Sequence, residues 1–489
     1  MSTTPPHPAQ SHLPPQPADD HPGGSPRSGL RAGRLGVGAI VFFVVATVAP
    51  MAALVGASPI VFSANGVAAP ATYLLAALLF AVFSVGYVAM SRHITNAGGF
   101  VAYIAQGFGA RLATAAAGLA ILTYTALQAA LWSQFSVFAH DLAAGKLGLD
   151  LPSPLWMFAG LVLVTALTVR GVDFSLKVLG FLVFLEIAAF VVLDVVIIVS
   201  GGISGNSPAA FDPSALVGPG LGIAFLFCIT CFTGFEATVV FSEEAKDPHR
   251  TIPRAVYYSI AFIGLFYALT TWALGNSVGA AAVQEAATAD PAGFVFTIAE
   301  QEVGTWLATT MEILVVTSFI AMLIGFQNMF ARYLFALGRA NVLPHRLGSA
   351  NPKTGTPATA ALTVGLALAV ILAGFTLAGA DPITVTFSWL LSLGTVSLIA
   401  ILTLTSASII VFFAKTRVES NIWTTRIAPA LALLGFGVVA YLAVANYDVL
   451  LGGQGGVARW LLLLIPLCAA LGFTWASIRP GINFQAQLV

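Results

Sequence analysis

The stretch FTGFEATVVFSEEAKDPHRTIPRA, residues 232–255, decides the fold. Its first half is apolar apart from a Gly-Phe-Glu step that places Glu236 among hydrophobic neighbours, and its second half gathers acids, bases and two prolines. A helix that leaves a lipid bilayer changes character in this way, because charged side chains are unfavourable in hydrocarbon and favourable in water. We therefore expect residues 237–241 to lie within the membrane and residues 242–255 to form a charged turn at its surface.

The composition of the whole chain indicates the same class of protein. Charged residues make up 8% of the 489 positions and hydrophobic residues 58%, whereas an average soluble protein has roughly 25% charged residues. Apolar runs repeatedly reach the ~20 residues that a helix needs to cross a bilayer. The expected fold class is an all-α integral membrane protein, and a soluble globular domain is excluded.

Hydropathy predicts about twelve membrane-spanning helices. Their expected ranges are 36–64, 70–91, 110–139, 154–170, 174–200, 217–241, 255–276, 303–338, 357–378, 384–413, 427–446 and 458–477. With both termini in the cytoplasm, all of the 20 Lys and Arg residues except Lys146 and Arg459 fall on the inner side, as the positive-inside rule requires. We expect a multi-pass protein of the plasma membrane with cytoplasmic N- and C-termini.

The two ends of the chain differ from its middle. Residues 1–35 are rich in Pro, His, Ser and Gly and lack the apolar stretch of a signal peptide, so we expect a disordered cytoplasmic tail. Residues 36–480 form the expected membrane domain, and residues 481–489 form a second cytoplasmic tail. The cysteines, Cys228, Cys231 and Cys468, all lie in apolar segments without a second cysteine pair or a histidine nearby, which favours buried small residues over a metal or redox site.

The first predicted span, GVGAIVFFVVATVAPMAALVGASPIVFSANG, carries helix-breaking residues in its interior. Pro50 interrupts the run, and Ser58 followed by Pro59 is typical of a helix start, since Ser caps well and Pro fits the first helical position. We expect the helix to stop near Val55–Gly56 and to restart at Pro59. The exposed N–H groups and the positive end of the helix dipole would then form a site for a carboxylate in the middle of the membrane.

The sixth predicted span has a companion break. Gly234 lies within the apolar run FLFCITCFTGFEATVVF and allows the helix to unwind, so carbonyl groups around Cys231–Thr233 could accept hydrogen bonds from an ammonium group. Each break alone could be a packing kink. Breaks at corresponding positions of two halves of the chain are instead typical of the binding site of a secondary transporter.

These features resemble a known family. The segment GFEATVVFSEEAKDPHRTIPRA resembles the sixth-helix motif of the amino acid–polyamine–organocation superfamily, NAGGFVAYIAQGFG resembles the Gly-rich element before its third helix, and ARYLFALGRANVLP resembles the end of its eighth helix. The resemblance covers about residues 36–480 and identifies the chain as a member of the amino acid permeases. It implies the LeuT-type fold, with a first repeat at 36–200, an inverted second repeat at 217–413 and two final helices at 427–477.

The resemblance also implies a substrate site between the first and sixth helices. In the family the first-helix break usually reads Gly-Ser-Gly, and this chain has Gly-Ala-Ser-Pro at 56–59. Phe235 matches an aromatic gate, and Glu236 would lie beside the site. The expected substrate-binding residues are Val55, Gly56, Ala57, Ser58, Tyr124, Gln128, Cys231, Phe232, Thr233, Gly234, Phe235 and Glu236.

Two sets of residues are candidates for coupling transport to an ion. Glu186 lies in the middle of the fifth span, where some proton-coupled members of the family carry a Lys, and a buried glutamate could take up the proton instead. Thr317 and Ser318 resemble the adjacent Thr-Ser pair that binds sodium in sodium-coupled LeuT-type proteins. The same two hydroxyls could simply bond to carbonyls of their own helix. Protons are favoured over sodium, and both remain open.

Other polar residues within the spans have several possible roles. Tyr124, Gln128 and Trp132 recur every four residues and so share one helix face, which could line the pathway together with Gln134, Ser388, Trp389 and Ser392. Asp194 and Glu312 are expected near the outer, water-exposed ends of their helices in structural roles. Gln327, Asn328 and Arg332 could bond between helices.

The sequence therefore predicts a secondary transporter that imports an amino acid or a related small amine by alternating access, with no cofactor beyond a coupling ion, H⁺ or Na⁺. Its expected partners are that substrate and the lipid bilayer, and no nucleic acid. A polyamine or amino-alcohol permease is the alternative within transporters. A channel or receptor does not predict paired helix breaks, and a membrane enzyme would need a cluster of catalytic or metal-binding residues that the sequence lacks.

Overall fold

The computed structural model describes residues 36–94, 99–171, 176–203, 205–236, 238, 245–351, 354–447, 451, 455–479, 481, 482 and 484. This part of the chain is built from helices and contains no strand. The predicted N-terminal tail, residues 1–35, lies outside the described residues, as does most of the predicted membrane boundary, residues 237 and 239–244.

The helices of the first half are α1 (Val37–Val48), α2 (Pro50–Asn65), η1 (Gly66–Ala68), α3 (Ala69–Ser91), α4 (Gly99–Phe108), α5 (Ala110–Leu147), α6 (Ser153–Arg170) and α7 (Leu176–Ser200). A short connection follows, with η2 (Pro208–Phe211) and α8 (Pro213–Leu216).

The second half contains α9 (Leu221–Cys231), α11 (Pro248–Val278), α12 (Val283–Ala289), α13 (Phe294–Glu302), α14 (Thr305–Arg339), η4 (His345–Gly348) and α15 (Ala358–Leu377). It continues through η5 (Pro382–Phe387), α16 (Ser388–Thr416), η6 (Trp423–Ile427), α17 (Ala428–Ala445), α19 (Gly455–Ala458), η7 (Arg459–Leu463) and α20 (Leu464–Ile478).

Ten segments among the described residues are long and apolar enough to cross a membrane, which confirms the all-α membrane class. One of them, Pro50–Ser91, runs through α2, η1 and α3, and the shorter apolar helices α1, α4 and α9 come in addition. The count of twelve spans and the division into two inverted repeats stay predictions.

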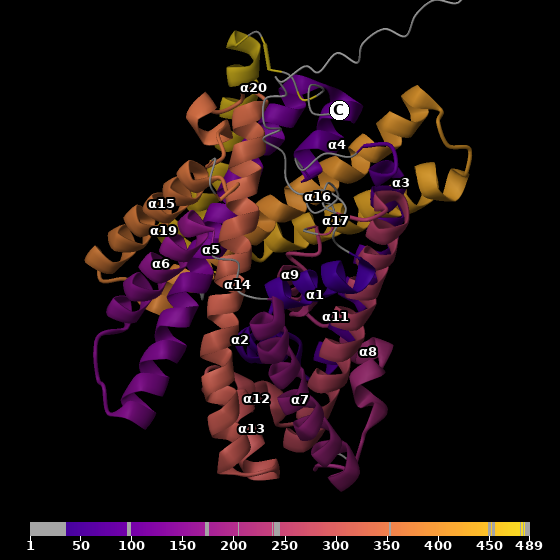
Figure 1. The fold of residues 1–489 in the computed structure, drawn as a ribbon. Coiled ribbons are helices and arrows are strands. Elements are labelled where there is room, and N and C mark those ends of the chain that lie inside the picture. The colour runs from indigo at the N-terminus through magenta and orange to yellow at the C-terminus, as the bar shows by residue number, and fades with distance from the viewer. Residues whose placement is uncertain are drawn as a thin grey trace, which may run out of the picture.

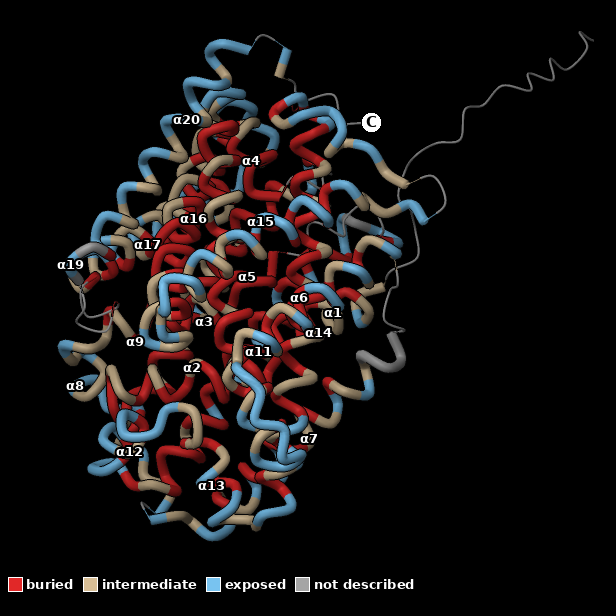
Figure 2. Tube along the Cα trace, turned by 90° about the vertical axis from the view of Figure 1, so that its left-hand side faces the viewer, coloured by how far each residue is buried: buried red, intermediate tan, exposed pale blue. Residues whose placement is uncertain are grey.

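The interior and the periphery of the molecule are made by different helices. α2 is buried over most of its length and contacts α9, α14, α7 and α12. α6, α15, α17 and α20 instead expose large apolar side chains such as Leu163, Leu366, Val438 and Leu471. Figure 2 shows the buried residues gathered inside and the exposed ones at the edges. An apolar exterior of this kind is what lipid requires, since lipid tails offer no partner for polar groups.

The ends of the molecule are also distinct. α4 and the C-terminal end lie at one end of the helix bundle, and α12 and α13 lie at the opposite end (Figure 1). The positive-inside pattern predicts that α4 faces the cytoplasm and that α12 and α13 face the outside. The short helices α1, α2 and α9 meet between these ends and position the candidate site.

Candidate functional site

The first helix break lies between α1 and α2, at Ala49 and Pro50. Ala49 adopts the left-handed conformation with φ of 50°, and Pro50 has no N–H to donate to the carbonyl of Ala46. The interruption expected at Pro50 is confirmed, and the second one expected at Gly56–Pro59 is wrong. Those residues lie inside α2, and Pro59 is accommodated within it, where the hydroxyl of Ser58 donates a hydrogen bond to the carbonyl of Leu54.

The start of α2 is capped by a carboxylate from another helix. The N–H of Met51 donates to Oε2 of Glu186 over 3.2 Å, and the N–H of Ala52 donates to Oγ of Ser318 over 3.3 Å. The hydroxyl of Ser318 in turn donates to Oε2 of Glu186 over 2.8 Å. A negative group at the positive end of a helix dipole is stabilised there. The helix start therefore lies at Pro50, nine positions before the expected restart at Pro59, and the protein's own Glu186 occupies its positive end.

Of the two residues proposed for sodium, only Ser318 joins this cluster. The hydroxyl of Thr317 donates to the carbonyl of Leu314 in its own helix over 2.9 Å. Glu186 and Ser318, from separate coupling hypotheses, therefore form one hydrogen-bonded unit at the first break. Glu186 is 1% exposed, so this unit is shielded from water.

The second break confirms the prediction from the opening motif. α9 ends at Cys231, and Gly234 has φ of 114°, a conformation that favours glycine. Oε2 of Glu236 accepts a hydrogen bond of 2.8 Å from the N–H of Gly234, and its Oε1 accepts one of 2.9 Å from the hydroxyl of Tyr124. Both carboxylate oxygens of Glu236 are used within the protein, so this residue shapes the break.

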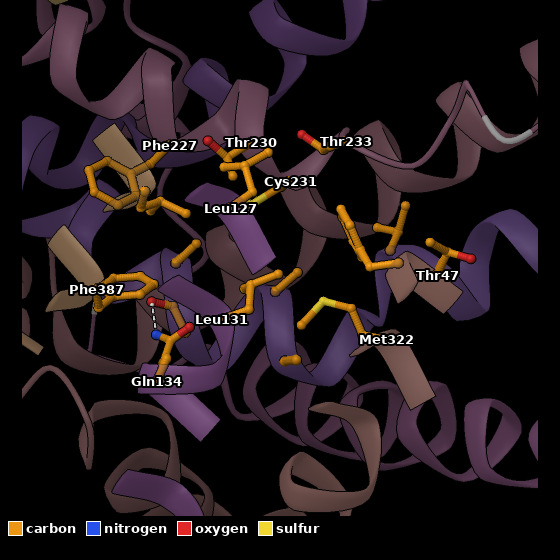
Figure 3. Close-up of a pocket in the computed structure, with 17 residues that line it drawn as sticks. Thr47, Leu127, Leu131, Gln134, Phe227, Thr230, Cys231, Thr233, Met322 and Phe387 are labelled. Carbon is orange, nitrogen blue, oxygen red and sulfur yellow. Dashed lines mark hydrogen bonds between the residues drawn. The ribbon is translucent and has the colours of Figure 1, made fainter. Parts of the chain in front are cut away.

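Within the described chain, the carbonyl groups of Cys231 and Thr233 accept no hydrogen bond. They are the freed carbonyls that the sequence predicted. Both residues line a cavity between the two breaks (Figure 3).

This cavity is small and mostly apolar. Its volume is about 60 Å³, whereas one water needs roughly 10–15 Å³ of such space. It is lined by Thr47, Val48, Ala52, Ala53, Gly56, Ala57, Leu127, Leu131, Gln134, Phe227, Thr230, Cys231, Thr233, Met322, Phe326, Phe387 and Leu391. None of these side chains carries a charge. Small residues on one face of α2 leave the space, and at one side of it the amide of Gln134 donates to the carbonyl of Gly56 over 3.2 Å.

The cavity includes part of the predicted substrate site, whose binding roles stay predictions. Gly56, Ala57, Cys231 and Thr233 line it, together with Gln134, which was expected in the pathway. The residues that were predicted to bind substrate and do not line it are Val55, Ser58, Tyr124, Gln128, Phe232, Gly234, Phe235 and Glu236.

Phe235 and Gln128 have packing roles instead. The ring of Phe235 packs against Phe80, Phe83 and Tyr87 in a buried aromatic cluster. The amide of Gln128 donates to the carbonyl of Leu323 in α14. Phe235 thus lies in a packed cluster beside the break, and its role as a gate stays a prediction.

On α5, the residues that line the cavity lie on a face next to that of Tyr124, Gln128 and Trp132. The cavity is lined by Leu127, Leu131 and Gln134, whose spacing of four and three residues is as regular as that of Tyr124, Gln128 and Trp132. α5 carries buried residues around much of its circumference. Its periodicity therefore gave no signal that could choose between the two faces.

Three further polar residues within the spans make contacts with neighbouring helices. Asp194 was expected near water and is instead 3% exposed, because α7 buries it against α11, where Thr270 donates to its Oδ2 over 2.7 Å. Glu312 pairs with Lys146 over 2.9 Å in a more open region. The amide of Gln327 bonds across to α6 and α15, which confirms a role between helices.

Comparisons of the sequence with known proteins identify its family. The amino acid permease family pattern matches residues 35–469. The branched-chain amino acid permease BcaP of Lactococcus lactis is 28% identical, with 70% of this chain and 74% of that protein covered. A methylthioribose transporter of Bacillus subtilis is 24% identical over 78% of this chain and 79% of its own length. The cationic amino acid transporter 7 of Arabidopsis thaliana is 26% identical over 61% and 53%. Because the family pattern covers most of the chain, this protein belongs to the amino acid permease family.

Proposed function

We propose that this permease is a secondary transporter of the plasma membrane that imports an amino acid with a neutral side chain, driven by protons that bind Glu186. The observation that carries the proposal is the hydrogen bond from the N–H of Met51 to the Glu186 carboxylate. It connects an ionisable group directly to the start of the helix that lines the cavity.

The cavity supports a neutral side chain on the substrate. No Asp, Glu, Lys, Arg or His is among its lining residues, and a charge buried without a partner is strongly unfavourable. The substrate ammonium would donate to the carbonyls of Cys231 and Thr233. A polyamine would bring additional positive charge into the same space, so the alternative substrate class is disfavoured. The branched-chain permease among the relatives is consistent with an apolar substrate.

Glu186 supports coupling because it occupies the position that a substrate carboxylate would need. An ionised carboxylate accepts hydrogen bonds more strongly than a neutral carboxyl does. A proton on Glu186 would therefore weaken its hold on Met51 and release the start of α2 for the substrate carboxylate. Proton binding and substrate binding would then favour the same state, as symport requires.

The test is uptake into liposomes that contain the purified protein. A panel of labelled neutral and cationic amino acids would be offered under an inward proton gradient, an inward sodium gradient or neither. The proposal expects accumulation of a neutral amino acid under the proton gradient alone. Accumulation under the sodium gradient alone, or of a polyamine in preference to every amino acid, would contradict it.

A further inference from the structure

A second buried carboxylate lies on the same helix as Glu186 and takes no part in the cavity. Asp194 is 3% exposed and accepts the hydroxyl of Thr270 at Oδ2 over 2.7 Å. Its Oδ1 is also buried and has no hydrogen-bond partner among the described residues. A carboxylate with a purely structural role would be expected to use both oxygens, because an unpaired buried acceptor is unfavourable.

Asp194 and Glu186 are arranged along one buried side of α7. They are separated by two helical turns, which is about 12 Å along the axis. Phe190 and Leu193, which lie between them on the same side, are 0% exposed. Asp194 is the nearer of the two to the predicted outer end of α7.

The neighbouring helix α11 carries hydroxyl groups on the face that includes Thr270. Tyr267, Thr270 and Ser277 follow one another at intervals of three and seven residues, so they share a helix face. The Tyr267 hydroxyl is buried without a hydrogen-bond partner in the described chain. Ser277 donates to Oε1 of Glu302 in α13 over 2.6 Å. Glu302 is only partly buried, so the series begins near the predicted outer surface.

Among the described residues, no ion pair compensates Asp194. Of the helices that pack against α7, α1 and α2 contain no ionisable side chain, and α11 faces Asp194 with the hydroxyl of Thr270. The ionisable residues at the outer ends of α13 and α14 are acidic: Glu300 and Glu302 in α13, and Glu312 in α14, which pairs with Lys146. The ion pairs found in the described residues do not include Asp194.

We propose that Asp194 is an intermediate proton-binding site on a route from the outer surface to Glu186, separate from the substrate cavity. This inference rests on the proposed proton-coupled transport. A proton from external water would bind the Asp194 carboxylate. It would then pass toward Glu186 through hydroxyl groups, each of which accepts one proton and gives up another. Glu186 becomes neutral and Asp194 is ionised again, so protons and charge balance.

The experiment compares three variants in liposomes, each assayed for uptake driven by a proton gradient and for exchange of substrate between the two sides without a gradient. Asp194→Asn should reduce driven uptake by about tenfold or more, as expected for loss of a proton-transfer group, and leave exchange intact. Thr270→Val should reduce driven uptake in the same selective way, and it nearly preserves the side-chain shape.

Thr271→Val is the matched control. Thr271 is as fully buried as Thr270, but its hydroxyl bonds only to carbonyls of its own helix, those of Tyr267 and Ala268. Driven uptake by this variant should equal that of the wild type. Retained exchange shows that each variant is folded. If Asp194→Asn loses exchange as well, the comparison of Thr270→Val with Thr271→Val tests the Asp194 site.

The outcomes separate this inference from the function on which it rests. A wild-type protein that is not driven by protons contradicts both. A proton-driven wild type with unaltered driven uptake in Asp194→Asn, or with equal rates in Thr270→Val and Thr271→Val, contradicts the Asp194 site alone.

Discussion

The carboxylate of Glu186 accepts a hydrogen bond from the N–H of Met51, a residue 135 positions away in the sequence. The bond joins the middle of α7 to the start of α2. The start of α2 is therefore held by an ionisable side chain. A change in the charge of Glu186 would change the strength of this hydrogen bond, at the start of a helix that lines the cavity.

Ser318 and Thr317 provide a test that separates protons from sodium. Ser318 bonds to Glu186 and to the N–H of Ala52, whereas Thr317 bonds to its own helix. We expect Ser318→Ala to reduce proton-driven uptake by about tenfold, since a hydrogen bond to a charged group contributes roughly 1.5–3 kcal/mol. Thr317→Val should be close to wild type. Equal losses in the two variants, with dependence on sodium, would indicate a sodium site made by both hydroxyls.

Gly56 has no side chain, which leaves room for the amide of Gln134 to lie against α2 at the cavity. A Cβ at position 56 would lie 2.8 Å from Nε2 and 2.9 Å from Oε1 of Gln134. Gly56→Val should therefore displace Gln134 and fill the space, lowering substrate affinity by about tenfold or more. Substrate-dependent thermal stabilisation measures this affinity. Gly374→Val is the control, because nothing lies within 4 Å of a Cβ there, and unchanged affinity in Gly56→Val would rule out this cavity as the site.

Tyr124 is predicted to matter for stability through Glu236. Tyr124→Phe removes the 2.9 Å hydrogen bond to Oε1 of Glu236 and leaves that buried oxygen unpaired. The free energy of unfolding should fall by about 1–3 kcal/mol, seen as a lower melting temperature of the detergent-solubilised protein. Tyr87→Phe is the matched control, since the Tyr87 hydroxyl is buried without a hydrogen-bond partner in the described chain. An equal loss in both variants would mean that aromatic packing, and not the bond to Glu236, is responsible.

The uncharged lining of the cavity predicts which ligands stabilise the protein. At a concentration 100 times its dissociation constant, a ligand that binds only the folded state adds about 2.7 kcal/mol. Neutral amino acids with apolar side chains should raise the melting temperature, and arginine and putrescine should not. Stabilisation by arginine or putrescine alone would contradict the assignment of a neutral substrate.

The membrane class, the approximate spans and the break at Gly234 could be predicted from the sequence, because each follows from local composition. The position of the first break could not. Pro50 and Pro59 are both possible helix breakers, and the choice depends on Glu186 and Ser318, which cap the helix that starts at Pro50.

Only some of the residues that line the cavity could be predicted from the sequence. Leu127 and Gln128 are adjacent on α5 and so point about 100° apart, and both are buried. Rotation of a helix that is buried on most sides is set by its neighbours, which periodicity does not reveal. The predicted lining residues of α5 were chosen mainly because they are polar, whereas the cavity is lined mainly by apolar side chains.

The central claim is that Glu186 couples protons to transport, and the most direct measurement is uptake by Glu186→Gln in liposomes as a function of the proton gradient. The glutamine keeps an acceptor for the N–H of Met51 but takes up no proton. We predict that accumulation driven by the gradient is abolished while exchange of substrate across the membrane continues. Gradient-driven accumulation equal to that of the wild type would contradict the account.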